Sequence, residues 1–231
     1  MNFPLPGDYI DIHNHDSSPG EGVFILNNLM AHEGSLPGNI SGIIYSLGIH
    51  PWFLNETNHG QLIDFVKQNA CDKSIAAIGE AGFDKLRGPA MQLQSRTFAE
   101  QAAISEETGK PMIIHCVKAW DELIAAHRKI RPKLPWLIHG FRGKKELAMQ
   151  LISRNMYLSF WFDFVLRPES SELFRSIPYD RIFLETDGSG ADIRKIYDKV
   201  SIDIGSNVEE LKNLILLNYC KMFGIRNLNT E

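Results

Sequence analysis

Imidazole and carboxylate side chains stand at the ends of apolar, strand-like runs in this sequence. Four histidines, one glutamate and one aspartate take such places: His13, His15, His115, His139, Glu80 and Asp187. Because the carboxyl ends of the strands in a parallel barrel all open onto one face, side chains at these ends collect there. Imidazole and carboxylate groups are the usual ligands of catalytic divalent cations. The pattern therefore predicts a site for two cations, built from strand ends.

Eight strand-like runs and the helical stretches between them indicate the fold class. The runs span residues 9–15, 22–27, 42–50, 75–80, 111–115, 135–139, 156–161 and 181–187. Helical spacing of apolar residues predicts helices over 92–108, 120–130, 144–154, 169–177 and 207–223. The first of these is followed by Gly109, a typical helix stop. Eight strands alternating with helices predict an α/β protein, a TIM (β/α)8 barrel.

The first quarter of the chain has little room for outer helices. Only residues 16–21, rich in Asp, Ser, Pro and Gly, separate the first two runs, and residues 28–39 offer about one helical turn before the third. A parallel crossover normally needs a dozen or more residues. We therefore expect a barrel that is distorted there, with reduced outer helices, and one domain over residues 1–231.

Composition restricts the possible partners and the compartment. The formal net charge is −4, which excludes a broad basic surface for nucleic acid but not a phosphate-cleaving pocket, since two bound cations would reverse the local sign. The three cysteines are odd in number and far apart, which argues against a disulfide framework. No apolar run is long enough for a membrane span, and the N-terminus does not resemble a signal peptide. We expect a cytoplasmic protein with no membrane contact and no obligate protein partner.

The chain resembles the TatD-like metal-dependent hydrolases along nearly its whole length. Seven motifs carry the resemblance in order: residues 11–15 (DIHNH), 48–52 (GIHPW), 78–84 (IGEAGFD), 113–115 (IIH), 139–143 (HGFRG), 159–160 (SF) and 184–187 (LETD). The resemblance implies a TIM barrel and a binuclear centre. It implies that His13, His15, Glu80 and Asp187 surround one metal and that Glu80, His115 and His139 surround the other.

The chemistry of these residues agrees with the resemblance. His13 and His15 are two apart on a strand, so both point to one face and can chelate one cation. Glu80 has two oxygens and can bridge two cations. We expect Asp187, rather than the buried Glu185, to be the ligand at the last strand and to orient or deprotonate the attacking water. Glu80 and Asp187 are thus the predicted catalytic residues.

Four further residues are candidates for contact with the substrate. His50, in the GIHPW motif, is expected to line the pocket, and Asp84 is either a substrate-side group or an ordinary loop carboxylate. Lys118 and Arg142 each follow a predicted ligand by three residues and could hold a phosphate, with surface solvation as the alternative. Asp11 is either a support for a histidine ring or a structural residue.

The leading functional hypothesis is a metal-dependent hydrolase of phosphodiester bonds. By resemblance it is a TatD-type deoxyribonuclease, a 3′–5′ exodeoxyribonuclease acting on single-stranded ends of DNA with water activated by two divalent cations. We expect two divalent cations per chain, Mg, Mn or Zn, and the sequence leaves open which of them. The alternative is an amidohydrolase-like enzyme acting on a small ester, lactone or amide; such relatives often have Lys at the fourth strand end, where this chain has Glu80. A scaffold protein with a decayed site is a third possibility, which failure to retain metal would support.

Overall fold

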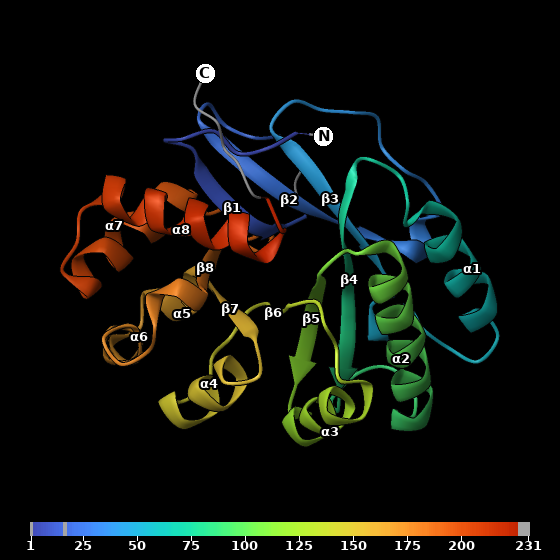
Figure 1. Cartoon of the computed structure of the whole chain (residues 1–231). Coiled ribbons are helices and arrows are strands. Elements are labelled where there is room, and N and C mark those ends of the chain that lie inside the picture. The colour runs from blue at the N-terminus through green and yellow to red at the C-terminus, as the bar shows by residue number, and fades with distance from the viewer. Residues whose placement is uncertain (1, 16–17, 226–231) are drawn as a thin grey trace. The chain divides into compact units, whose positions relative to one another are not determined.

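Eight parallel strands alternate with helices in the computed structural model, which describes residues 2–15 and 18–225 (Figure 1). The strand order follows the chain order from β1 to β8. The strands are β1 Tyr9–Asn14, β2 Val23–Met30, β3 Ile43–Gly48, β4 Ile75–Asp84, β5 Met112–Val117, β6 Trp136–Ile138, β7 Met156–Trp161 and β8 Ile182–Glu185. All eight strands predicted from the sequence are present, and the predicted α/β class with a (β/α)8 strand order is confirmed.

The helices confirm the five predicted ones and add three. They are α1 His59–Asn69, α2 Met91–Thr108, α3 Trp120–Ile130, α4 Lys145–Ile152, α5 Phe162–Val165, α6 Pro168–Phe174, α7 Ile193–Ile204 and α8 Val208–Met222. Helices α1, α5 and α7 were not predicted. In α7 the buried Ile193, Ile196, Tyr197 and Val200 have helical spacing. These β-branched and aromatic side chains favour strands locally, and packing in the folded chain outweighs that preference.

The first quarter is as sparse in helices as predicted. Residues 18–22, before β2, contain no helix, while residues 16 and 17 of the predicted connection lie outside the described residues. Between β2 and β3 the only helical element is the 3-10 turn Ala31–Glu33. The first outer α-helix is α1, between β3 and β4.

The chain divides into two compact units, each with its own contacts. Unit 1 contains residues 28–40 and 44–139, and unit 2 contains residues 2–27, 41–43 and those from 140 onward. In unit 1, β4 pairs with β3 and β5, and β5 with β6, all in parallel, while α2 packs along β4 (Figure 1). In unit 2, β1 pairs with β2 and β7 with β8, and the first and last strands contact each other. One domain over 1–231 stays a prediction.

Two glycines let β4 lie close to β5, where two of the predicted ligands stand. A Cβ at Gly82 would lie 1.9 Å from the carbonyl oxygen of His115, and one at Gly79 would lie 2.3 Å from that of Ile113. Both glycines have positive φ angles, 157° and 142°, which side chains disfavour. The glycines on either side of Glu80 therefore set how closely it approaches His115.

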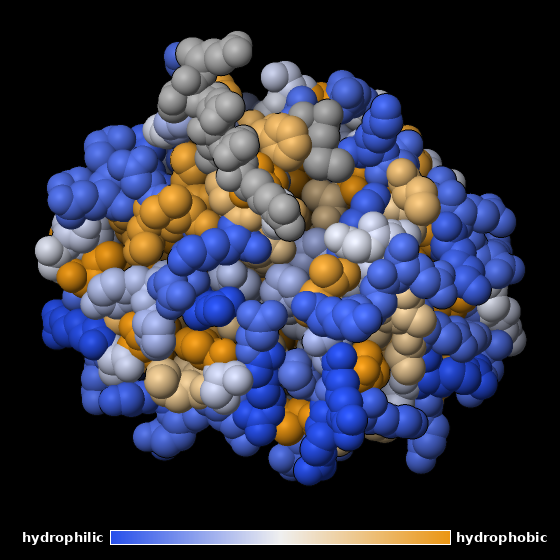
Figure 2. All heavy atoms as spheres, viewed as in Figure 1, coloured by the Kyte–Doolittle hydropathy of each residue, from blue (hydrophilic) through white to orange (hydrophobic). Residues whose placement is uncertain are grey.

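The visible surface is mainly hydrophilic, with separate apolar patches (Figure 2). Large apolar side chains that are exposed include Trp52, Phe53 and Leu86. Among residues 2–15 and 18–225, no helix is both long and apolar enough to cross a membrane.

Candidate metal centre

Glu80 lies in unit 1 among three imidazole rings. Its Oε1 atom is 2.8 Å from Nδ1 of His115, 2.7 Å from Nε2 of His139 and 3.2 Å from Nε2 of His50. The Glu80 side chain is only 3% exposed, so this carboxylate and the rings meet out of bulk water. The structure brings together the predicted ligands Glu80, His115 and His139, and it adds His50, which was predicted to line the pocket or contact the substrate.

Asn28 holds the backbone and carboxylate of Glu80, Ser46 holds Asn28, and neither was a candidate in the sequence. The Asn28 Oδ1 atom accepts hydrogen bonds from the Glu80 backbone N–H (2.8 Å) and the Ser46 hydroxyl (3.0 Å). The Asn28 amide donates to Glu80 Oε2 at 3.4 Å. All three residues are buried. The sequence signal was the polar pair at 27 and 28 inside an apolar strand, where asparagine is disfavoured.

Asp84, at the end of β4, fixes the orientation of the His115 ring. Its Oδ2 atom lies 3.2 Å from His115 Nε2 and accepts a hydrogen bond from the Trp52 indole N–H at 2.6 Å. Its Oδ1 atom accepts the backbone N–H groups of Leu86 and Arg87. Burial by itself raises the pKa of Asp84, but these hydrogen bonds outweigh it and the pKa is lowered. An ionised Asp84 would accept the Nε2–H of His115 and leave the lone pair of Nδ1 facing Glu80, the tautomer that a cation at this site requires.

His50 is kept in its neutral form by its surroundings. Burial lowers the pKa of His50, while the hydrogen bond to Glu80 acts in the opposite direction. Its Nδ1 atom accepts the backbone N–H of Trp52 at 3.1 Å, which leaves Nε2 facing Glu80. Because Nδ1 accepts this bond, the neutral ring carries its proton on Nε2 and donates it to the Glu80 carboxylate.

His13, His15 and Asp187 form a second cluster, in unit 2. The Asp187 Oδ1 atom lies 3.6 Å from His13 Nε2 and 3.4 Å from His15 Nε2, and the two rings meet edge to face. The Asp187 backbone N–H donates to the His13 carbonyl oxygen, and its φ of 52° turns the chain sharply after β8. The following Gly188 leaves space for the His15 ring, since a Cβ there would lie 3.2 Å from His15 Cβ.

Asp11 and Glu185 are buried next to this cluster, and hydrogen bonds hold both carboxylates. Asp11 accepts hydrogen bonds from the Thr186 backbone N–H (3.0 Å), the Thr186 hydroxyl (2.6 Å) and the Asn14 amide (2.8 Å). Burial raises the pKa of Asp11 to about 7. Of the two roles considered for Asp11, these partners favour the structural one, joining β1 to the end of β8. Glu185 is fully buried, as expected, and accepts the Gly140 backbone N–H at 2.7 Å and the Ser159 hydroxyl.

Both clusters offer ligand sets suited to divalent cations. The possible ligand atoms of His13, His15 and Asp187 lie within 4.8 Å of one another, and so do those of His50, Glu80 and His115. Imidazole nitrogen with carboxylate oxygen suits zinc, manganese or iron. The close approach of one carboxylate oxygen to several imidazole nitrogens is the arrangement that a cation between them would stabilise.

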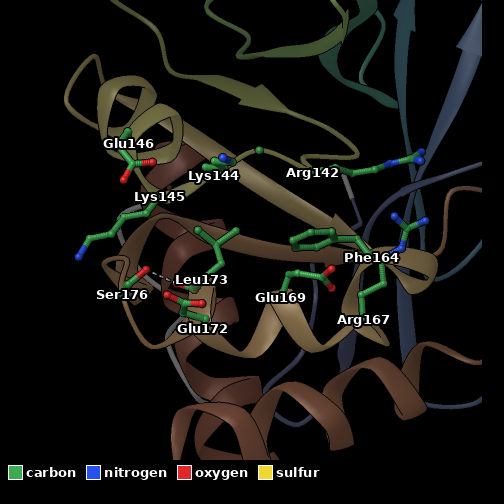
Figure 3. A pocket seen from close by; sticks show the side chains of 11 residues that line it. Arg142, Lys144, Lys145, Glu146, Phe164, Arg167, Glu169, Glu172, Leu173 and Ser176 are labelled. Carbon is green, nitrogen blue, oxygen red and sulfur yellow. Dashed lines mark hydrogen bonds between the residues drawn. The ribbon is translucent and has the colours of Figure 1, made fainter.

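Lys118 and Arg142 lie in the loops after β5 and β6, and Cys116 lies near the end of β5. Lys118 is exposed, and the Arg142 guanidinium stacks over the Trp161 ring at 4.2 Å. Arg142 lines a cavity of about 480 Å³ in unit 2, together with Arg167 (Figure 3). Within the described part of the chain, no carboxylate pairs with Lys118 or Arg142, so both positively charged side chains can bind an anion. Burial raises the pKa of the Cys116 thiol to about 12, which disfavours a nucleophilic role.

Comparison with known proteins identifies the family of the chain. The family model described as TatD related DNase matches residues 33–224. The metal-dependent hydrolase YcfH of Escherichia coli (strain K12) is 26% identical over 211 residues, which cover 84% of this chain and 78% of that protein. The 3′-5′ ssDNA/RNA exonuclease TatD of Pantoea ananatis is 28% identical over 200 residues, covering 77% of this chain and 76% of that protein.

Solved structures show the same fold along almost the whole chain. The TatD family hydrolase of Entamoeba histolytica superposes with a TM-score of 0.76 at 17% identity, over 94% of this chain and 98% of that one. The TatD homologue YJJV of Escherichia coli gives a TM-score of 0.76 at 18% identity, over 96% of this chain and all of that one. These matches confirm the predicted TIM-barrel fold. With a family model matching most of its length, the chain belongs to the TatD-related DNases, a family of metal-dependent hydrolases.

Proposed function

We propose that this protein is a metal-dependent phosphodiesterase that removes nucleotides from single-stranded ends of DNA. The observation that carries the proposal is the position of Glu80 Oε1, which lies within 3.2 Å of nitrogen atoms of three imidazoles in a buried pocket. Such a carboxylate and imidazole set is made to hold a divalent cation. The relative named 3′-5′ ssDNA/RNA exonuclease supports nucleic acid as the substrate.

Two groups of residues would hold cations. Glu80, His115 and His139 would bind one, and His13, His15 and Asp187 would bind another; the sharing of Glu80 between both cations stays a prediction from the sequence. A bound divalent cation supplies Lewis-acid activation of water and neutralises the charge that develops on the phosphate.

The chain's own groups orient the ligands and move the proton. Asp84 holds the Nε2–H of His115, so that Nδ1 is directed to the site. Asn28 holds Glu80 through both its backbone and its carboxylate. The Asp187 carboxylate is 22% exposed, and we assign it the role of accepting the proton of the attacking water at an Oδ atom.

A substrate screen tests the proposal. The protein is loaded separately with Mg, Mn or Zn and is offered single-stranded DNA, duplex DNA, RNA, bis(p-nitrophenyl) phosphate, an aryl ester and a lactone. We expect the highest kcat/KM on single-stranded DNA. Glu80→Gln is the control for the site, because glutamine keeps the shape but not the charge, and we expect at least about 100-fold lower activity with the fold intact. Faster turnover of the ester or lactone than of every phosphodiester would refute the proposal and favour the amidohydrolase-like alternative.

A further inference from the structure

Two exposed aromatic side chains flank the Glu80 cluster in unit 1. Trp52 is 39% exposed and Phe53 is 40% exposed, although both belong to the 3-10 turn Pro51–Phe53 directly after His50. Each residue buries more than half of its surface and leaves the remainder open to a ligand. Two adjacent aromatic side chains that are partly exposed beside a cluster of candidate ligands form a candidate binding surface.

His50 connects both rings to the carboxylate. Its ring centre lies 4.8 Å from that of Trp52 and 5.9 Å from that of Phe53, while its Nε2 atom lies 3.2 Å from Glu80 Oε1. A group stacked on either ring is thus separated from Glu80 by one imidazole. Both rings therefore contact the imidazole that itself contacts Glu80.

The Trp52 ring is held rigidly. Its indole N–H donates to Asp84 at 2.6 Å and its backbone N–H donates to His50 Nδ1 at 3.1 Å. Phe53 is stacked on the His32 ring, with centres 4.0 Å apart and an angle of 19° between the planes. Rings that are already ordered lose little conformational entropy when a ligand binds, which favours affinity.

The positively charged guanidinium group of Arg87 lies over the Trp52 ring. The guanidinium carbon of Arg87 is 3.7 Å from the ring centre. Within the described ranges, no carboxylate forms an ion pair with Arg87, so its N–H donors can bind an anion. An aromatic ring with a stacked, unpaired guanidinium matches a nucleotide, whose base stacks and whose phosphate accepts hydrogen bonds.

We propose that Trp52, Phe53 and Arg87 form a stacking platform that binds unpaired nucleotides of a single-stranded nucleic acid next to Glu80. The rings stack on bases, and Arg87 binds a backbone phosphate. Paired bases are stacked on their neighbours and expose only their edges, so the platform selects single strands and frayed ends over closed duplex. The inference rests on the proposed function and adds the residues that select its substrate.

The test measures binding without cleavage. A fluorescently labelled single-stranded oligodeoxynucleotide is titrated with the protein in EDTA, and the Kd is read from fluorescence polarisation. A second probe of the same length is abasic, so that it keeps the phosphates and lacks the bases. We expect Phe53→Ser to weaken binding of the normal probe by roughly 5-fold or more and to leave binding of the abasic probe nearly unchanged. Arg87→Gln is expected to weaken binding of both probes.

Matched variants separate the platform from general effects on the fold. Phe53→Trp keeps an aromatic ring and should restore binding. Leu217→Ser removes an exposed apolar side chain on α8, and Arg96→Gln removes an exposed arginine that is already paired with Glu56. Neither should change the Kd. Thermal melting of each variant shows whether it is folded, and Phe53→Trp should melt close to the wild type because it keeps an aromatic ring on His32.

The outcomes distinguish the platform from the proposed function. Equal Kd values for wild type and Phe53→Ser, or equal losses of Phe53→Ser on both probes, would overturn the platform even if the wild type cleaves DNA. A base-dependent loss of affinity supports the platform even if the metal-loaded wild type cleaves no phosphodiester, which would refute the proposed function alone.

Discussion

Replacing Asn28 with aspartate tests whether the surroundings of Glu80 tolerate a second buried carboxylate. The change is nearly isosteric, and one aspartate oxygen can still accept the Glu80 backbone N–H and the Ser46 hydroxyl. The other oxygen takes the place of the amide nitrogen, which lies 3.4 Å from Glu80 Oε2. The substitution therefore replaces the hydrogen bond between the Asn28 amide and Glu80 with a repulsive contact between two buried carboxylates.

The expected loss of stability follows from this distance. Two unit charges 3.4 Å apart repel by about 5 kcal/mol at an effective dielectric constant of about 20. Protonation of one carboxyl limits this cost, since moving a proton onto a group with a pKa of about 3.9 costs about 4 kcal/mol at pH 7. The free energy of unfolding should then fall by about 4 kcal/mol at pH 7, which lowers Tm by roughly 10 °C for a chain of this size.

The sign of the pH dependence provides a second measurement. The folded state raises the pKa of the carboxyl pair, so the penalty grows as pH rises above about 3.9 and shrinks as pH falls. At pH 5 it should be only about 1.5 kcal/mol. Urea unfolding at both pH values in EDTA measures the difference, and Asn207→Asp at the N-cap of α8, where both residues cap equally well, is the control. Equal stability of Asn28→Asp and wild type at pH 7 would refute the reasoning.

Three more expectations follow from the same structure. Gly82→Ala should destabilise the protein by about 3 kcal/mol or more because its Cβ would lie 1.9 Å from the carbonyl oxygen of His115, whereas Gly60→Ala in the open part of α1 should not; equal urea midpoints for the two would contradict this. Lys118→Met or Arg142→Met should raise KM about 10-fold for a phosphodiester but not for a neutral ester, and equal changes on both would assign these residues to loop support. The logarithm of DNA affinity should fall with the logarithm of salt concentration with a slope of only roughly 1–3, since few basic residues can displace counterions; a slope near 10 would indicate extensive backbone binding.

Local sequence patterns determined the order of the strands and the residue types at their ends. Apolar runs that end in His13, His115 and Asp187 are readable because a strand has a side-chain period of two and a buried strand is mainly apolar. The spacing of His13 and His15 likewise predicts a shared face without reference to any distant residue. Helix α7 was not predicted because its side chains, taken locally, favour a strand.

Only the tertiary structure decided which side chains meet around each cluster. Asn28 contacts Glu80 across 52 positions of sequence, and Trp52 contacts Asp84 across 32. No local period records such pairs, because they depend on the register and close approach of separate strands. The same holds for His50, which the sequence placed in the pocket wall and the fold placed against Glu80. The amino-acid types that could bind a cation are a property of the sequence, whereas the tautomer, burial and orientation that fit them for binding arise from packing between strands.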